Sequence, residues 1–258
     1  MRIIITGAAS GIGRALALTL AEKEPDAALL LVGRDEAKLK SLAQSLPRAE
    51  TVAADLAKAE SAARVVAAAH TALGGIDAVV SNAGAIFPGA LAALSIEDFE
   101  RAFAINVRAT FLLAQAAYPA LKQSKGAFVA TGSLAGRNPS PGLGAYSASK
   151  AALSMLIGQL AAEWGPDGIR CNCVSPGTTY TPMNAAFYAD PANRAAREAN
   201  IPLSRLGEAV DIANVIHFLL RPEASFVSGI DLLADGGANT MFMPLYLRNA
   251  TPSGPPGA

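Results

Sequence analysis

The hydrophobic pattern of this 258-residue chain alternates between short aliphatic runs and longer amphipathic stretches rich in alanine and leucine. Most of the short runs are continuously apolar, which is typical of strands covered on both faces of a sheet. Strand–helix alternation of this kind predicts a parallel sheet with right-handed crossovers and helices on both faces. The predicted strands are 3–6, 28–32, 51–54, 78–81, 127–131, 169–174 and 230–233, and the predicted helices are 12–23, 36–45, 61–73, 96–122, 145–164 and 208–220.

These elements use almost the whole chain and predict one α/β domain, a Rossmann-type doubly wound parallel sheet of seven strands. We expect the domain to span residues 1–237. It includes the segment 177–203, which is too long for a plain connection and is typical of a lid or binding loop. Residues 238–258 are predicted to be a C-terminal tail, and we expect its apolar stretch 241–247 to pack on a neighbouring subunit or over the active site.

Composition excludes several classes of function. The 21 basic and 21 acidic residues give a formal net charge of zero, whereas binders of nucleic acid or anionic membranes need a basic excess. No stretch approaches the roughly 18 apolar residues of a transmembrane helix, and the N-terminus has no apolar core of an export signal. The only two cysteines, Cys171 and Cys173, favour a cytoplasmic protein. We interpret them as buried small apolar residues, not metal ligands.

A glycine-rich turn, TGAASGIG at residues 6–13, follows the first predicted strand directly. Glycine is needed where a backbone turns tightly, approaches a pyrophosphate and lets a helix pack close to the sheet. The N-terminus of the following helix offers unpaired N–H groups and a positive dipole end to an anion. A turn that merely connects strand and helix is the alternative, but its place after the first strand favours phosphate binding. The candidate phosphate-binding residues are Gly7, Ser10, Gly11, Ile12 and Gly13.

A tyrosine and a lysine, Tyr146 and Lys150, lie four residues apart on a predicted helix and therefore share one of its faces. A free phenol is a poor base at neutral pH, and an ammonium group nearby favours its ionised form. The pair therefore suits acid–base chemistry. Ser133 strengthens this interpretation, because it follows a predicted strand at the edge of the sheet where ligands of α/β proteins bind.

Together these motifs resemble the short-chain dehydrogenase/reductase family. The glycine turn, Asn106, Ser133, Tyr146 and Lys150 occur in the family's order, and the resemblance covers residues 3 to about 237. It implies an NAD(P)-dependent oxidoreductase that transfers hydride between nicotinamide and a carbonyl or secondary alcohol. It also implies that Tyr146 is the acid/base and that Ser133 binds the substrate oxygen. Lys150 would bind the nicotinamide ribose, and Asn106 would support a proton relay.

The resemblance also bears on the cofactor. The aspartate of NAD-binding relatives would stand at Gly33, whereas Arg34 at the next position suits the 2′-phosphate of NADP. Alternatively, Arg34 is a solvated charge before a helix that Asp35 caps. Ser10 stands where NADP-preferring relatives often carry a basic residue. We expect NADP, with NAD possible. Further cofactor contacts implied by the resemblance are Asp55, Leu56, Asn82, Ala83, Gly84, Tyr146, Lys150, Pro176, Gly177, Thr179 and Thr181.

The substrate pocket should be lined by residues after Gly84, after Ser133 and in the long loop. These are mostly apolar and suit an apolar ketone or secondary alcohol. Residues 183–200 are interpreted as a mobile lid. Arg137 and Asn138 are either a polar anchor for the substrate or solvated loop residues. The predicted lining residues are Ile86, Phe87, Leu134, Leu143, Met183, Phe187 and Tyr188.

Assembly and chemistry have alternatives at this point. The resemblance implies a homo-oligomer, a tetramer or dimer joined through helices 96–122 and 145–164. Apart from further copies of itself, we expect the protein to bind a small-molecule substrate, and we expect it to bind neither nucleic acid nor a membrane. The rival functions are isomerase or lyase chemistry on the same fold, a non-catalytic dinucleotide-sensing protein and a scaffold protein. Because all four catalytic positions are filled, the sensing protein is disfavoured.

Overall fold

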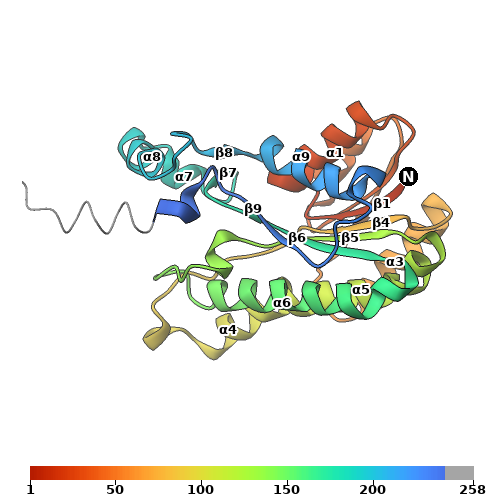
Figure 1. Ribbon diagram of the computed structural model, residues 1–258, viewed down its shortest axis with the longest axis horizontal. Helices are drawn as coiled ribbons and strands as arrows, with labels where there is room; N and C mark the ends of the chain where they lie inside the picture. Colours follow the sequence, from red (N-terminus) through yellow and green to blue (C-terminus); the bar gives the residue numbers. More distant parts are fainter. Residues whose placement is uncertain (242–258) are drawn as a thin grey trace, which may run out of the picture.

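A parallel sheet organises the molecule, a computed structural model in which residues 1–241 are described. Its strand order is β3-β2-β1-β4-β5-β6-β9, and every neighbouring pair is parallel (Figure 1). The predicted doubly wound fold is confirmed, and each strand bound lies within two residues of the prediction. The strands are β1 (Arg2–Thr6), β2 (Ala28–Gly33), β3 (Ala49–Ala53), β4 (Ala78–Ser81), β5 (Ala127–Thr131), β6 (Arg170–Pro176) and β9 (Asp231–Ala234).

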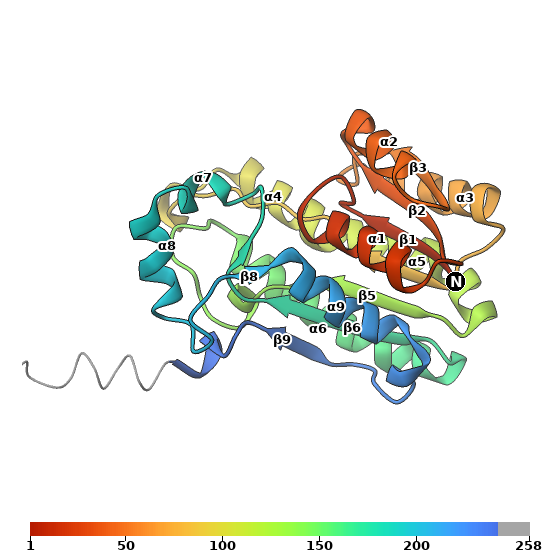
Figure 2. The ribbon, with the colours of Figure 1, turned by 90° about the horizontal axis from the view of Figure 1, so that it is seen from above.

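Helices cover both faces of the sheet (Figures 1 and 2). Residues of α1, α2 and α9 pack on one face, and residues of α3, α5 and α6 pack on the other. The helices are α1 (Gly11–Lys23), α2 (Glu36–Gln44), α3 (Ser61–Leu73), α4 (Ile96–Phe103), α5 (Ala109–Ser124), α6 (Tyr146–Trp164), α7 (Ala185–Tyr188), α8 (Pro191–Glu198) and α9 (Ala209–Leu220).

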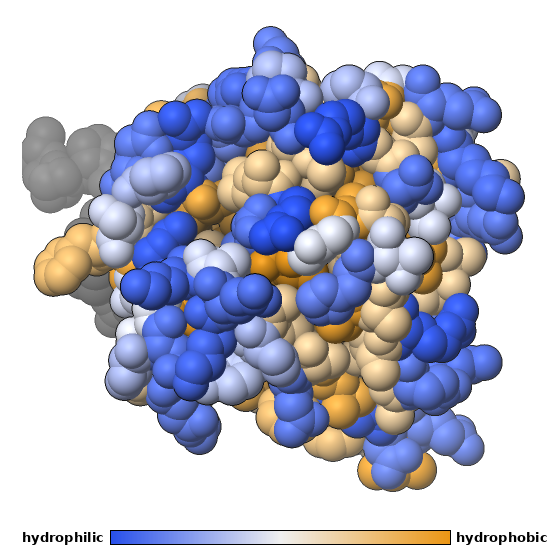
Figure 3. Space-filling view, turned by 90° about the vertical axis from the view of Figure 1, so that its right-hand side faces the viewer, coloured by the Kyte–Doolittle hydropathy of each residue, from blue (hydrophilic) through white to orange (hydrophobic). Residues whose placement is uncertain are grey.

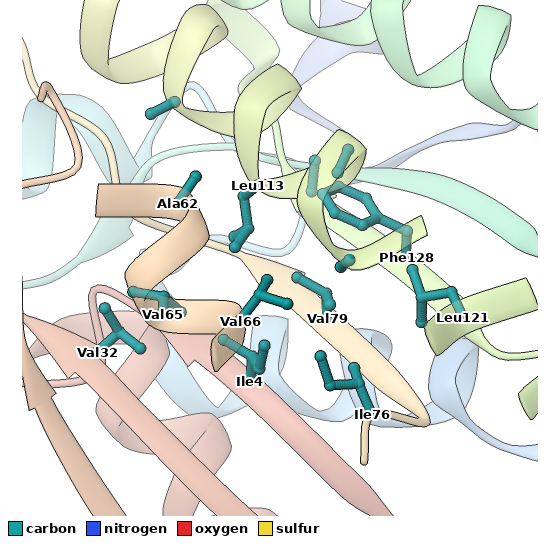
Figure 4. Packing of buried hydrophobic residues seen from close by; sticks show 14 of the residues in the cluster. Ile4, Val32, Ala62, Val65, Val66, Ile76, Val79, Leu113, Leu121 and Phe128 are labelled. Atoms are coloured by element: carbon teal, nitrogen blue, oxygen red, sulfur yellow. The ribbon is translucent and has the colours of Figure 1, made fainter. Parts of the chain in front are cut away.

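Alternate side chains of each central strand enter opposite halves of the core. Ile4, Val79 and Phe128 point toward α3 and α5, where Figure 4 shows them among other fully buried residues. Ile3 and Ile5 enter the layer of α1 and α9 instead. Because both faces of the strands are buried, the strands read in the sequence as continuous apolar runs.

The predicted helix 96–122 is helical along its whole length, but it is interrupted by a change of helix type. α4 and α5 are separated by a π-helical segment, Ala104–Arg108. A π segment adds a residue to one helical turn, and such segments occur frequently at functional sites. Here it contains Asn106, whose buried side chain hydrogen-bonds Ala85. Hydrophobic periodicity carries no signal for such an insertion, because the apolar stripe continues on both sides.

The long segment after β6 is more ordered than a loop. Strand β7 (Thr179–Tyr180) pairs in parallel with β8 (Gly207–Glu208), which closes the base of the segment. Between them, α7 and α8 lie together at one end of the molecule (Figure 2). Neither strand was predicted, because two residues are too few to show a period.

The two cysteines lie in the core. Cys171 and Cys173 are fully buried on β6, as predicted, and burial raises the pKa of each thiol to about 12. Thiols with such high pKa values are poor nucleophiles and metal ligands at neutral pH. The cysteines therefore serve as core side chains.

Within residues 1–241, no helix is long and apolar enough to cross a bilayer. On the face shown in Figure 3, hydrophilic residues occupy most of the rim and apolar residues are exposed between them. Such a mixed surface is ordinary for a folded domain. In the predicted apolar stretch 241–247, only Met241 lies within the described residues, where it ends the 3₁₀ turn Ala238–Met241.

An ion pair joins the start of β1 to the residue before β4. The guanidinium of Arg2 donates to both carboxylate oxygens of Asp77, at 3.1 and 2.6 Å, and the Arg2 backbone N–H donates to Oδ2 at 2.7 Å. Burial raises the pKa of the Asp77 carboxyl, but the hydrogen bonds and charge of Arg2 outweigh it and hold that pKa below its ordinary 3.8.

We therefore expect Asp77→Asn to lower the free energy of unfolding at pH 7 by about 1 kcal/mol. Because the pKa of Asp77 is lower in the folded state, its stabilisation is present above the ordinary value and lost as pH falls through the folded value. Urea unfolding at several pH values between 7 and 3 measures the difference. The difference in free energy of unfolding between the wild type and Asp77→Asn should shrink toward zero in acid. Asp98→Asn is the control, because Asp98 forms an exposed ion pair with Arg101. A difference that stays constant with pH would contradict this account.

Candidate active site

The glycine turn between β1 and α1 is packed against the end of β4. A Cβ atom at Gly13 would lie 2.4 Å from the Gly7 carbonyl oxygen and 2.8 Å from Asn82 Nδ2. A Cβ at Gly7, which has a φ of +66°, would lie 2.9 Å from the same nitrogen. No side chain fits these positions, so the turn is shaped by the absence of Cβ atoms.

The N-terminus of α1 fits an anion. Ser10 precedes the helix in an extended conformation, and its side chain makes no capping hydrogen bond. The first N–H groups of the helix therefore have no partner from that side chain, and the helix dipole adds positive potential there. Gly11, with a φ of +53°, lies beneath Thr181, whose Cγ2 would be 3.5 Å from an added Cβ. The residues present fit the pyrophosphate of a dinucleotide.

Asn82 ties the ends of three neighbouring strands together. Its Nδ2 donates to the Thr6 carbonyl oxygen at 3.1 Å, and its Oδ1 accepts from Thr131 Oγ1 at 3.1 Å. The Thr6 hydroxyl accepts the backbone N–H groups of Asn82 and Ala83, at 2.9 and 3.0 Å. The glycine turn on β1 is thus linked by hydrogen bonds through β4 to the end of β5.

Lys150 and Tyr146 lie on the first two turns of α6, at the same edge of the sheet. Lys150 is buried, and its Nζ donates to the Thr131 carbonyl oxygen at 2.7 Å. Nζ is also 5.8 Å from the centre of the Tyr146 ring. An ammonium has three N–H bonds, so Nζ retains donors for another partner. The lysine therefore joins the chain of hydrogen bonds that begins at Thr6.

Asn106 holds the segment after β4 in place. Its Oδ1 accepts the Ala85 N–H at 2.9 Å, and its Nδ2 donates to the Ala85 carbonyl oxygen at 2.9 Å and to Ser149 Oγ at 3.0 Å. A Cβ at Gly84 would lie 3.1 Å from Asn106 Oδ1 and 3.4 Å from Lys150 Nζ. Both groups therefore flank Gly84. The side-chain amide of Asn106 is engaged in holding backbone.

Ser133 begins a short 3₁₀ turn, η3 (Leu134–Gly136), two residues after β5 ends. Its Oγ accepts the Ala135 N–H at 3.1 Å. A hydroxyl that accepts a hydrogen bond keeps its own hydrogen for donation. A Cβ at Gly136 would lie 2.9 Å from the Lys150 carbonyl carbon, so this turn packs on the α6 backbone.

The predicted adenosine contacts follow β2 and β3. Arg34 is exposed and forms no ion pair within residues 1–241, while Asp35 caps α2 by accepting the Lys38 N–H at 3.0 Å. Asp55 is exposed and accepts the Ala57 N–H at 3.1 Å, which leaves its other carboxylate oxygen available. Leu56 is buried in the core, so only its backbone can reach a ligand.

The loop after β6 crosses back over the glycine turn. Gly177, which follows Pro176, packs on Asp235, since a Cβ there would lie 2.6 Å from that residue's Cβ. Asn184 organises the loop: its Nδ2 donates to the Thr179 carbonyl oxygen at 2.8 Å and its Oδ1 accepts the Thr181 N–H at 2.9 Å. Thr179 is buried and Thr181 lies over Gly11.

Residues of the predicted substrate lining fall into three groups. Ile86, Phe87, Leu134 and Leu143 are half-buried in loops around the strand ends. Met183 and Phe187 are 62% and 55% exposed. The assignment of Tyr188 is wrong, because it is buried in a separate cluster with Ile201 and Leu206, where α7 needs an apolar contact of its own.

Sequence reasoning missed four residues that build this edge of the sheet: Thr6, Ala85, Thr131 and Ser149. Thr6 and Thr131 each end a strand, and that position is a usable signal in an α/β sheet. Ala85 and Ser149 both hydrogen-bond Asn106 in the π-helical segment, and no local sequence pattern indicates these contacts. Arg137, interpreted as a substrate anchor or a solvated loop residue, is exposed and also pairs with Asp231.

The glycine turn and the lysine–tyrosine pair thus meet at one edge of a doubly wound sheet, the edge at which sheets of this kind bind dinucleotides. Comparison with known proteins specifies the family. A family model described as Enoyl-(Acyl carrier protein) reductase matches residues 7–239. The chain belongs to the short-chain dehydrogenase/reductase family.

Individual relatives are similar over nearly their whole length. The glucose 1-dehydrogenase of Gluconobacter oxydans is 35% identical over 92% of this chain and 91% of its own. The 2,5-dichloro-2,5-cyclohexadiene-1,4-diol dehydrogenase of Sphingobium indicum is 34% identical over 91% of this chain and 94% of its own. The crystal structure of a candidate NAD(P)-dependent gluconate 5-dehydrogenase from Beutenbergia cavernae, with NADP bound at low occupancy, superposes with a TM-score of 0.85. It is 32% identical and covers 92% of this chain and 96% of its own.

The packing of the turn predicts that Gly13→Ala weakens cofactor binding at least about tenfold, because its Cβ forces Gly7 and Asn82 apart and displaces the phosphate site. Titration of NADPH by its fluorescence measures the dissociation constant. Gly165→Ala is the matched control, because an added Cβ there meets nothing within 4 Å. Equal affinities of Gly13→Ala and the control would contradict the proposed phosphate site.

Proposed function

We propose that this protein interconverts a secondary alcohol and its ketone with NADP as the hydride acceptor or donor. The observation that carries the proposal is the hydrogen-bonded chain from the glycine turn through Asn82 and Thr131 to Lys150, beside Tyr146. It joins a phosphate site to an acid–base pair. Two of the relatives reported above are named as dehydrogenases of glucose and of a dichlorinated cyclohexadiene diol, and both of these compounds carry hydroxyl groups.

Four side chains would divide the chemistry. Bound nicotinamide supplies or accepts the hydride. The Tyr146 hydroxyl gives a proton to the substrate oxygen in reduction and takes it in oxidation, and the nearby ammonium of Lys150 stabilises negative charge on the phenolic oxygen. Ser133 orients the same substrate oxygen with its free hydroxyl hydrogen.

Lys150 and Asn106 act behind the tyrosine. The remaining N–H bonds of Lys150 suit the ribose hydroxyls of the nicotinamide half. Asn106 supports the proton relay by fixing Ala85, which keeps Gly84 beside Lys150 Nζ. Because Gly84 has no Cβ, the space at Nζ stays open for the relay.

The preference for NADP rests on the end of β2. Gly33 carries no carboxylate to bind a ribose 2′-hydroxyl. The guanidinium of Arg34 is exposed and can bind a 2′-phosphate. NAD remains a possible second cofactor. The further contacts we propose are Gly7, Ser10, Gly11, Ile12, Gly13, Asp55, Leu56, Asn82, Ala83, Gly84, Pro176, Gly177, Thr179 and Thr181.

An apolar substrate is favoured by the residues around the strand ends. Ile86, Leu134 and Leu143 are apolar and half-buried there, and Met183 and Phe187 expose apolar surface on the segment 177–203. We propose that residues 183–200, which include α7 and α8, close over the substrate and exclude water.

We propose a homo-oligomer joined through α5 and α6. Phe111 on α5 is 42% exposed and Met155 on α6 is 74% exposed, and a surface cavity of about 220 Å³ lies between the two helices. A second copy would cover this apolar surface. We place the catalytic domain in residues 1–237, with 238–258 as a tail, and the protein in the cytoplasm.

Tyr146→Phe should lower turnover by about 10²–10⁴-fold, because the variant keeps the ring but cannot transfer the proton. The assay follows reduced nicotinamide absorbance with a panel of ketones and secondary alcohols, using NADP(H) and NAD(H) in parallel. Cofactor affinity should stay within about twofold of the wild type, since no phosphate contact is lost. Tyr118→Phe is the control, because Tyr118 is a half-buried residue of α5 whose hydroxyl donates to Asp167.

Near-normal turnover of Tyr146→Phe would overturn the assigned acid–base role. Isomerase or lyase chemistry would show itself as product formed without net change of reduced cofactor. A sensing protein would bind NADPH and turn over no member of the panel. Tighter binding of NADH than of NADPH would overturn the role proposed for Arg34.

A further inference from the structure

The turn that begins at Ser133 is held by a network outside the catalytic residues. Arg137 follows this turn directly, and its Nε donates to Asp231 Oδ2 at 3.3 Å. Its Nη2 also donates to the Asp231 backbone carbonyl oxygen. Ser154, on α6, donates its hydroxyl to the same Oδ2 at 2.8 Å. One carboxylate oxygen thus joins the turn, the edge strand β9 and helix α6.

The turn itself is short and internally bonded. Ser133 Oγ accepts the Ala135 N–H at 3.1 Å, the Ser133 carbonyl oxygen accepts the Gly136 N–H at 2.9 Å, and Leu134 accepts the Arg137 N–H at 3.0 Å. A displacement of Arg137 therefore moves the backbone that carries Ser133.

The opposite side of the turn rests on the catalytic helix. A Cβ at Gly136 would lie 2.9 Å from the Lys150 carbonyl carbon and 3.1 Å from the Ala151 nitrogen. The turn is consequently clamped between α6, at the residue next to Lys150, and β9, at Asp231. Both contacts are made by the short turn that begins at Ser133.

Asp231 lies on β9, an edge strand of the sheet, and one of its carboxylate oxygens is unpaired within the described part of the chain. Its side chain is 14% exposed, and its Oδ1 is buried without a hydrogen-bond partner among residues 1–241. Buried acceptors without partners are rare in folded proteins, and each calls for an explanation. The explanation offered by the geometry is that the carboxylate is retained for its other oxygen, which binds Arg137 and Ser154.

We propose that Arg137, Asp231 and Ser154 are positioning residues, which hold the Ser133 hydroxyl in register with Tyr146. The inference rests on the proposed function, in which both hydroxyls address one substrate oxygen. A displacement of about 1 Å at such a contact can reduce turnover by about a hundredfold without loss of substrate binding.

The test compares Arg137→Met with Arg137→Lys and Asp231→Asn. A surface cavity of about 390 Å³, lined in part by Arg137, Ser154 and Asp231, gives the new side chains room. Arg2→Met is the matched control, because Arg2 pairs with Asp77 in a similar way at the N-terminal ends of the strands. Hydrogen exchange of the amides of residues 135–138 and steady-state kinetics are measured for every variant.

Arg137→Met should raise exchange at these amides at least about tenfold and lower kcat at least about tenfold, with KM and NADPH affinity within about twofold. Arg137→Lys should restore most of kcat, and Arg2→Met should change neither measurement. Asp231→Asn should act like Arg137→Met and decides the matter if the latter does not fold.

Wild-type exchange in a folded Arg137→Met would overturn the proposal, as would faster exchange with an unchanged kcat. Equal falls of kcat in Arg137→Met and Arg2→Met would mean that the network only stabilises the fold in general. That result would also overturn the proposal. If the wild-type protein turns over no alcohol or ketone, the proposed function fails. The exchange result then still shows whether Arg137 and Asp231 hold the turn.

Discussion

The side-chain amide of Asn82 is the interaction on which the rest of this site depends. It donates to the end of β1 and accepts from the end of β5, so it fixes the spacing of three parallel strands where they open toward the ligand crevice. The carbonyl oxygen of Thr131, the same residue that donates to Asn82, binds Lys150. The end of β1, where the glycine turn begins, and Lys150 are therefore parts of one hydrogen-bonded structure.

The glycines of the first turn make this arrangement possible. Gly7 and Gly13 leave open the space that the Asn82 amide occupies, and any side chain at either position would displace it. The same absence of side chains lets the first N–H groups of α1 approach an anion. The close packing and the proposed phosphate site thus have one physical cause.

Much of this fold can be predicted from the sequence because its strands are buried on both faces. The run 78–81 matches β4, and 127–131 matches β5, since a strand covered on both faces appears in the sequence as a largely apolar run. The positions of Asn82, Ser133 and Lys150 at strand ends or on α6 follow from the same pattern. Their identities then indicate the chemistry.

The features that cannot be predicted from the sequence depend on contacts between distant parts of the chain. The π-helical segment Ala104–Arg108 depends on the fit of Asn106 to Ala85, and Tyr188 is buried because α7 packs on Ile201. The ion pair of Arg137 with Asp231 spans 94 residues. No local period or propensity encodes a partner at that separation, so a loop arginine reads as a solvated charge.

The most direct test of the link through Asn82 is a double-mutant cycle on NADPH affinity with Asn82→Ala and Thr131→Val. Asn82 touches the glycine turn, whereas the Thr131 hydroxyl reaches it only through Asn82. If the two residues act as one structure, the loss of binding energy in the double variant differs from the sum of the single losses by at least about 0.5 kcal/mol. Additive losses would contradict the account, because they would mean that the phosphate site and the end of β5 are independent.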